Sequence, residues 1–222
     1  TIEDATKLAE AMISIGNSLG RNTMAMITDM NQPLGNTIGN AIEIREAIET
    51  LKGHGPKDFT ELCMQAAEIM LMQGKVAENK EEARKMLEEV VASGKAFETF
   101  KDMVKAQGGN VDMIENPELL PQSKFKTEIK SEESGNVKVL HSERLGVLAM
   151  QLGAGRETKE QDVNHAVGLE LACKRGDKVN KGDTICIVYH DEELKPQWVD
   201  ELYHAFELTN EEVAPQPIIE KV

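Results

Sequence analysis

The spacing of apolar residues is helical through the first half of this chain and changes to a period of two in the second half. From Ile2 to Ile13 the apolar positions recur three or four residues apart, which predicts an amphipathic helix that ends at residues 17–20. Residues 23–28 alternate apolar and small side chains and predict a buried strand. Further helices are expected at about 39–51, 58–73, 80–93 and 96–106, and the segment 58–73 is apolar enough to predict burial.

Two prolines, Pro117 and Pro121, mark a boundary after which strands predominate. Period-two segments separated by Gly-Asn and Gly-Asp turns predict strands at residues 125–131, 135–140, 167–173 and 183–190. Helices are expected at about 142–151 and 196–208. We therefore expect residues 1–118 to form a helix-rich α/β domain and residues 119–222 to form a smaller, β-rich α+β domain.

The first of these domains has too few strands for a sheet of its own, because a single strand cannot form one. The first predicted helix also begins at the first residue of the chain. We therefore expect the rest of this sheet to come from another part of a longer protein.

Composition narrows the classes of partner. The net charge of −14 argues against a nucleic-acid surface, which normally carries a basic stripe. No apolar run approaches the roughly 20 residues of a membrane span, and no signal peptide is recognised. Cys63, Cys173 and Cys186 lie among apolar neighbours, so we expect reduced core cysteines in a cytoplasmic protein.

The segment TDMNQPLGNTIGNAIEIREAIE, residues 28–49, is the strongest candidate for a site. A turn through Pro33 and Gly35 leads into a helix that carries Glu43 and Glu46 one helical turn apart. Turn carbonyls with a carboxylate suit a hard cation, whereas the helix N-terminus suits an anion such as phosphate. The third alternative is a tight connection whose glutamates face solvent, and spacing alone favours it.

Two other segments were considered as sites. RGDKVNKGDTICIVY, residues 175–189, resembles the hairpin of lipoyl and biotinyl carriers, but Lys178 and Lys181 lack the neighbours of a modified lysine, so a structural hairpin is favoured. In residues 150–171, Gly153, Gly155 and Arg156 fit neither a P-loop nor a dinucleotide fingerprint, and His165 is a lone histidine. The sequence therefore assigns no catalytic and no substrate-binding residue.

Three segments in order resemble the pyrimidine nucleoside phosphorylases and the closely similar thymidine phosphorylases: DMNQPLGNTIGNAIEIREAIETLKGHGPKDFTELC, LGAGRETKEQDVNHAVGLEL and GDKVNKGD. The resemblance covers essentially the whole chain and identifies it as the C-terminal half of such an enzyme. It implies a homodimeric pentosyltransferase that cleaves uridine, thymidine or deoxyuridine with inorganic phosphate, giving the free base and a pentose 1-phosphate. The phosphate loop and base-binding residues would lie in the N-terminal half, so this chain alone is expected to be inactive.

The resemblance also implies a potassium ion bound by the backbone carbonyls of Leu34 and Thr37 and by the Glu46 carboxylate. The other oxygen ligands would come from the phosphate loop of the N-terminal half. Two alternatives remain for the chain as a whole. A relative of the anthranilate-type phosphoribosyltransferases would share the α/β fold but lack the β-rich domain, and a non-catalytic carrier module would need a modified lysine.

Overall fold

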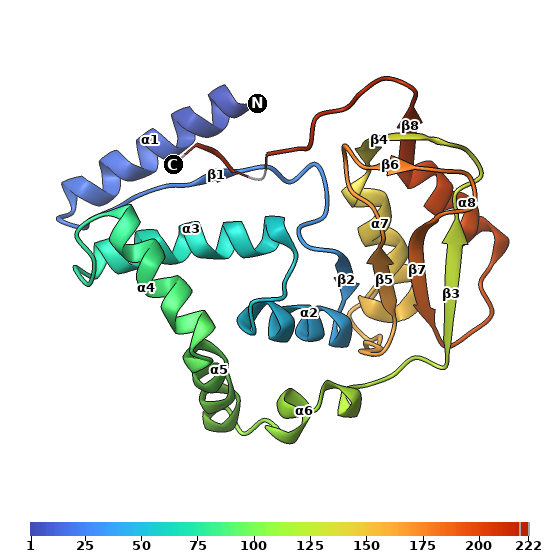
Figure 1. Ribbon diagram of the computed structural model, residues 1–222, viewed down its shortest axis with the longest axis horizontal. Coiled ribbons are helices and arrows are strands. Elements are labelled where there is room, and N and C mark those ends of the chain that lie inside the picture. Colours follow the sequence, from blue (N-terminus) through green and yellow to red (C-terminus); the bar gives the residue numbers. More distant parts are fainter. Residues whose placement is uncertain (218, 222) are drawn as a thin grey trace.

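The computed structural model describes residues 1–217 and 219–221, and it places most helices in one part and most strands in another (Figure 1). The helices are α1 (Ile2–Ser18), α2 (Ala41–Leu51), α3 (Lys57–Gln73), α4 (Lys80–Ala92), α5 (Lys95–Ala106), α6 (Asp112–Glu115), the 3-10 turn η1 (Pro117–Leu119), α7 (Ser142–Ala149), the π-helical turn η2 (Met150–Ala154) and α8 (Pro196–Ala205). The strands are β1 (Ile27–Thr28), β2 (Thr37–Gly39), β3 (Phe125–Lys130), β4 (Gly135–Leu140), β5 (Gly168–Leu171), β6 (Lys178–Val179), β7 (Thr184–His190), β8 (Phe206–Thr209) and β9 (Ile219–Lys221). The molecule is thus a helix-rich α/β part followed by a smaller, β-rich part, as expected.

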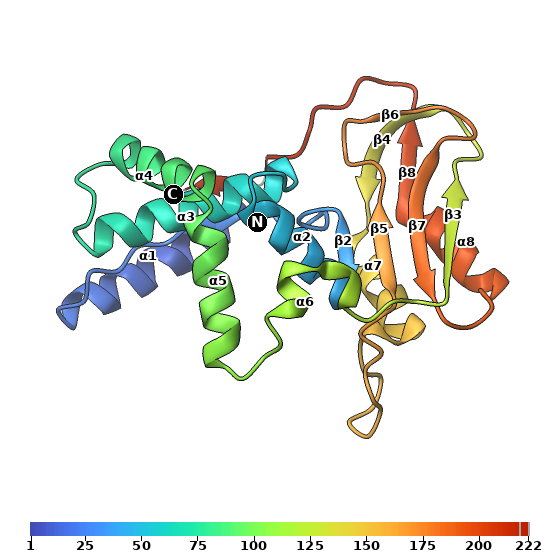
Figure 2. The ribbon, with the colours of Figure 1, turned by 60° about the horizontal axis from the view of Figure 1, so that its bottom comes forward.

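The β-rich part holds the main core. Strands in the order β2-β5-β7-β3 form one antiparallel sheet, and β6-β4-β8 form a second (Figure 2). Together with α7 and α8 they enclose an apolar core, to which β7 contributes the buried side chains of Ile185, Cys186 and Val188. Its fully buried members include Val137, Leu140, Leu145, Leu169, Cys186, Val188 and Leu202.

Strand β2 comes from the first half of the chain but joins the sheet of the second half. Thr37 pairs with Glu170, and Gly39 pairs with Gly168. At Gly168, where φ is +157°, a Cβ would collide with the carbonyl oxygen of Ile38, so only glycine allows this close approach. The sequence did not predict β2, because three residues are too few to show a period. The pairing joins residues 37–39 to the β-rich part, although these residues lie before the boundary expected after residue 118. That boundary stays a prediction.

Helices α1 to α5 and α7 and the four long strands β3, β4, β5 and β7 lie where the spacing predicted them, within about two residues, the usual uncertainty of helix ends. The short elements α6 and η1 were not predicted. Helix α1 begins at Ile2, because the Thr1 hydroxyl accepts a hydrogen bond from the Asp4 amide at 3.2 Å. One prediction at the end of the chain was wrong. The helix expected at 196–208 ends at Ala205, because Phe206–Thr209 form β8 and pair with β4.

The predicted burial of the first half was also wrong in two places. Within residues 23–28 only Ile27 and Thr28 form a strand, which pairs with β9 and is half-buried. In α3 the only buried residue is Glu68, and Met70 is 69% exposed. Both segments are apolar enough for a core, but the described residues do not supply the surfaces that would cover them.

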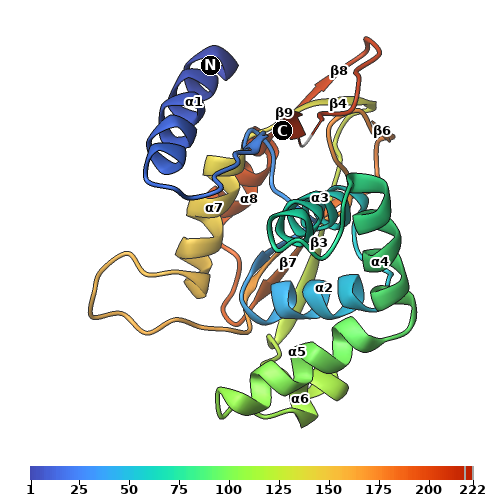
Figure 3. The same ribbon diagram turned by 90° about the vertical axis from the view of Figure 1, so that its left-hand side faces the viewer.

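Helix α1 stands apart from the other helices (Figure 3). It shows the same feature most clearly, because none of its residues is buried. Leu8, Met12, Ile15 and Leu19 are each at least 60% exposed, and their spacing of four, three and four residues places them along one side of the helix. We call these four residues the α1 stripe. An uncovered apolar stripe of this kind marks an interaction surface.

The cysteines fit the prediction only in part. Cys173 and Cys186 are buried free thiols, and burial raises the pKa of each to about 12. Cys63 is also a free thiol but is exposed, because it lies on the uncovered side of α3.

No helix in residues 1–217 combines the length and the apolar character that a bilayer crossing needs.

Candidate functional site

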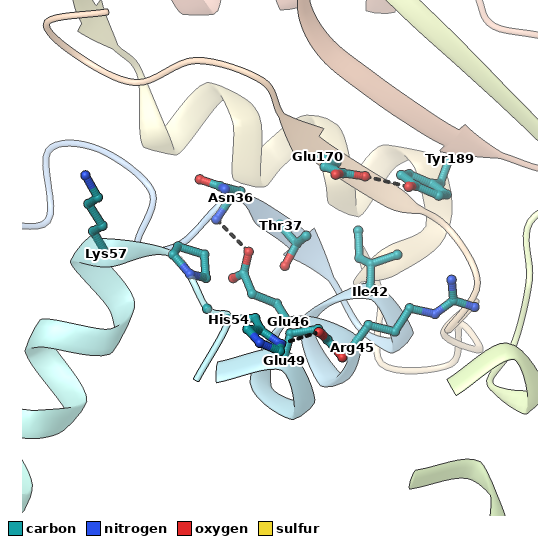
Figure 4. Close-up of a pocket in the computed structure, with 12 residues that line it drawn as sticks. Asn36, Thr37, Ile42, Arg45, Glu46, Glu49, His54, Lys57, Glu170 and Tyr189 are labelled. Atoms are coloured by element: carbon teal, nitrogen blue, oxygen red, sulfur yellow. Dashed lines mark hydrogen bonds and ion pairs between the residues drawn. The ribbon is translucent and has the colours of Figure 1, made fainter. Parts of the chain in front are cut away.

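The turn of residues 32–37 packs against the carboxylate of Glu46 (Figure 4). The Asn36 backbone amide donates a hydrogen bond to Glu46 Oε1 at 2.8 Å. Gly35 has a φ of +68°, and a Cβ at this position would collide with Glu46 Oε2. Only glycine therefore lets the turn close over the carboxylate. Leu34 and Thr37 flank Gly35 and Asn36 in the chain. The structure thus brings these two predicted residues close to Glu46.

Oxygen atoms accumulate at this turn. Thr37 begins β2, and its buried hydroxyl makes no hydrogen bond of normal geometry to any described residue, although it lies near enough to the Glu46 carboxyl to lower its pKa. The side-chain oxygen of Gln32 is also buried and lacks such a bond within the described part of the chain. Buried polar atoms without partners are costly, and oxygen atoms are the ligands that hard cations prefer. The donor set of the turn therefore fits a potassium-like ion.

The electrostatics of Glu46 point the same way. Partial burial raises the pKa of this carboxyl above its ordinary value, and nearby Asp58 adds to the effect. The Asn36 amide, the Thr37 hydroxyl and the charge of Lys174 oppose the shift without cancelling it. A carboxylate in such a setting is stabilised by a nearby positive charge. No cluster of three His, Cys, Asp or Glu side chains suited to a metal occurs among the described residues, so backbone oxygens would have to complete the shell.

Two backbone amides at the start of α2 are already engaged. The Ala41 amide donates to the carbonyl of His165 at 3.0 Å, and the Gly39 amide donates to Glu43 Oε1, also at 3.0 Å. Asn40, at the helix start, donates its side-chain amide to the carbonyl of Ala154. These contacts engage two amides near the helix start, and they give Glu43 a role at the helix start rather than at the turn.

A cavity of about 500 Å³ opens beside Glu46, between α2, the segment 54–57 and the ends of β2, β5 and β7 (Figure 4). The Tyr189 hydroxyl donates to Glu170 Oε2 at 2.5 Å, and burial together with this carboxylate raises the pKa of Tyr189. Arg45 Nε is buried and makes no hydrogen bond to any residue that the structure describes. Sequence reasoning missed these three residues, because only the pairing of β2, β5 and β7 brings Glu170 and Tyr189 to α2.

The other candidate segments have structural roles. Lys178 and Lys181 are exposed, while Asp177 and Asp183 accept hydrogen bonds from the amides of Lys174 and Asn180 in the turns of the hairpin. These contacts of Asp177 and Asp183 hold the turns of the hairpin, and the choice between a structural hairpin and a carrier stays a prediction.

The glycines near residue 154 shape the exit from η2. Gly153 has a φ of +109°, and its carbonyl accepts a hydrogen bond from the Asn164 amide, which closes the base of the projecting loop between η2 and β5 (Figure 2). Arg156 and His165 are exposed on this loop. Among the described residues, no hydrogen bond connects Arg156 or His165 to the turn of residues 32–37.

Comparisons with known proteins match both parts of the chain. Residues 1–97 match the a/b domain of a glycosyl transferase family, and residues 136–209 match the pyrimidine nucleoside phosphorylase C-terminal domain. The chain is 47% identical, over 215 residues, to the pyrimidine-nucleoside phosphorylases of Staphylococcus aureus strains USA300 and NCTC 8325 / PS 47. The matched residues are 97% of this chain and 50% of each relative, so the chain spans about half the length of these curated relatives.

Proposed function

Because this chain belongs to the pyrimidine nucleoside phosphorylase family, we propose that it is the C-terminal half of a pentosyltransferase that cleaves pyrimidine nucleosides with phosphate. The substrates would be uridine, thymidine or deoxyuridine, and the products the free base and a pentose 1-phosphate. The observation that carries this proposal is the high identity to phosphorylases across both parts of the chain. The match to the β-rich phosphorylase domain at residues 136–209 argues against a phosphoribosyltransferase that lacks such a domain.

The partner that completes the enzyme is proposed to be the N-terminal half, which would carry the phosphate loop and the base-binding groups. The α1 stripe supports this assignment, since it presents apolar surface that the described residues leave uncovered, and among the described strands β1 pairs with β9 alone. Their place in the helix-rich part agrees with an α/β domain shared between two halves. A homodimer of the completed enzyme and a cytoplasmic location stay predictions.

The proposed cofactor is a potassium ion held by the backbone carbonyls of Leu34 and Thr37 and by the Glu46 carboxylate. When bound, it would supply positive charge next to the phosphate loop, where inorganic phosphate is expected to bind. The residues of this chain prepare the site. The Asn36 amide orients the Glu46 carboxylate, and Gly35 leaves the space in which that carboxylate meets the turn.

The test is complementation. The chain is assayed for phosphorolysis of uridine and thymidine, first alone and then with a polypeptide that corresponds to the N-terminal half of the relatives. We expect turnover only in the mixture, because positioned attack by phosphate on the anomeric carbon needs groups from both halves. Turnover by this chain alone would show that the proposed division of roles is wrong. An inactive mixture whose two halves form a stable complex would contradict the proposed activity.

A further inference from the structure

Lys174 connects the β-rich part to the turn that faces Glu46. It lies three residues after the end of β5, and its ammonium group donates hydrogen bonds to the carbonyl of Pro33 and, at 3.0 Å, to Asp58 Oδ2. The side chains of Lys174 and Asp58 are only 19% and 22% exposed. Solvent screens an ion pair at this depth far less than a surface pair. Removing one partner therefore leaves the other charge uncompensated, which is destabilising.

Asp58 adds a second contact to the same turn. It lies in the first turn of α3, and its Oδ2 also accepts a hydrogen bond from the Gly35 amide at 3.2 Å. The pair therefore contacts the carbonyl before Leu34 and the amide after it. Three segments that are far apart in the sequence meet at this point: the turn, the start of α3 and the loop that follows β5.

We propose that Lys174 and Asp58 are positioning residues that hold the Pro33–Gly35 turn in the shape that binds the cation. This inference rests on the proposed function for its cation. The pair fixes both backbone groups that flank Leu34, and it links the turn to the β-rich part through Lys174. Cation affinity would then depend on a contact between the two parts of the chain, without either side chain touching the ion.

The charges of the pair lead to an unusual expectation. Lys174 Nζ donates to the carbonyl of Pro33, the residue next to the proposed ligand Leu34, so its charge also acts on any cation bound there. Asp58 offsets this repulsion. Removing the charge of Asp58 alone should therefore weaken cation binding more than removing Lys174 alone. The double variant should bind the cation more tightly than Asp58→Asn, because the repulsive charge of Lys174 is gone, even though its turn is still loose. If the pair only shaped the turn, removing both charges would not restore any affinity.

Cation binding can be measured without catalysis. The two halves are combined, and the melting temperature is followed as KCl replaces tetramethylammonium chloride at constant ionic strength. For Asp58→Asn we expect the half-saturating potassium concentration to rise by about tenfold, and for Lys174→Met by about threefold, with the double variant between wild type and Asp58→Asn. Asp102→Asn on α5 and Lys178→Met on β6 are the controls, since both side chains are exposed and should leave the value unchanged.

Hydrogen exchange of this chain alone tests the turn directly. The amides of residues 34–38 should exchange faster in Asp58→Asn and in Lys174→Met, while those of β7 keep their protection. Unchanged exchange at the turn in both variants would overturn the proposal. So would potassium half-saturation within twofold of wild type, or a wild-type complex that potassium does not stabilise at all. If the wild-type complex lacks phosphorolysis but the variants weaken potassium binding as described, the proposed activity fails and this inference stands.

Discussion

The Asn36 backbone amide donates a hydrogen bond to Glu46 Oε1 at 2.8 Å, across the turn that precedes α2. This contact turns the Glu46 side chain back from the helix toward the turn, where Oε2 lies against Gly35. The carboxylate is therefore part of the turn and not a solvated surface acid.

Glu46→Gln should weaken potassium binding by tenfold or more, because the change removes the charge and keeps the shape. In the completed enzyme the KM for phosphate should rise more than the KM for the nucleoside, since the cation is expected beside the phosphate loop. The matched control is Glu43→Gln, whose remaining oxygen can still accept from the Gly39 amide. Potassium dependence and melting temperature that do not change in Glu46→Gln would show that Glu46 is not a ligand.

Gly35→Ala should destabilise the chain by about 2–4 kcal/mol, because a positive φ is combined with a collision against Glu46. Gly182→Ala is the control, since Gly182 has a φ of +91° but no atom near the position of a Cβ. That variant should cost only about 1 kcal/mol through backbone strain. Urea unfolding measures both free energies, and equal losses would mean that the Glu46 contact contributes nothing.

The titration of Glu46 should contribute to the pH dependence of the free energy of unfolding. Because its pKa in the folded state is raised above the ordinary value of 4.5, the folded chain binds this proton more tightly than the unfolded chain. The contribution of Glu46 to stability is therefore largest below pH 4.5 and falls as the pH rises through the raised pKa. Without potassium, the free energy of unfolding of wild type should decline relative to Glu46→Gln over this range. A difference that is constant with pH would contradict the shift.

The α1 stripe should be required for binding the N-terminal half. Met12→Glu places a charge in the middle of the stripe and should abolish the complex, since burial of each large apolar side chain contributes about 1.5–3 kcal/mol. Ser14→Glu is the control, because Ser14 is exposed and lies on a different side of α1. Analytical ultracentrifugation of the mixed halves measures the association. Equal affinity of the two variants would mean that the partner binds elsewhere.

A polypeptide of residues 121–222 should fold alone and unfold cooperatively, because every buried member of the main core lies between Ile129 and Phe206. Its stability should be lower than that of the whole chain, since β2 no longer covers the edge of β5 and Ile38 no longer packs on the core. Circular dichroism in urea tests the cooperativity, and hydrogen exchange should show faster exchange in β5 than in β7. A disordered polypeptide, or one whose Lys178 or Lys181 carries biotin or lipoate, would contradict this prediction.

The sequence by itself determined the elements whose pattern repeats within a few residues. The long helices and the four long strands follow from apolar spacing, and the turn with Pro33, Gly35 and Glu46 is a candidate site on the sequence alone. Gly35 shows why this worked, since a residue required for a local backbone conformation leaves a local signal.

Tertiary structure decided what surrounds that turn. Thr37 pairs with Glu170, Tyr189 bonds Glu170, and Lys174 and Asp58 contact the backbone on both sides of Leu34. These partners come from segments far apart in the chain, and no spacing in the sequence relates them. The exposure of the α1 stripe was equally unpredictable, because apolar spacing shows that a face must be covered but not which surface covers it. Local pattern fixes the elements, whereas contacts between distant segments depend on how the whole chain packs.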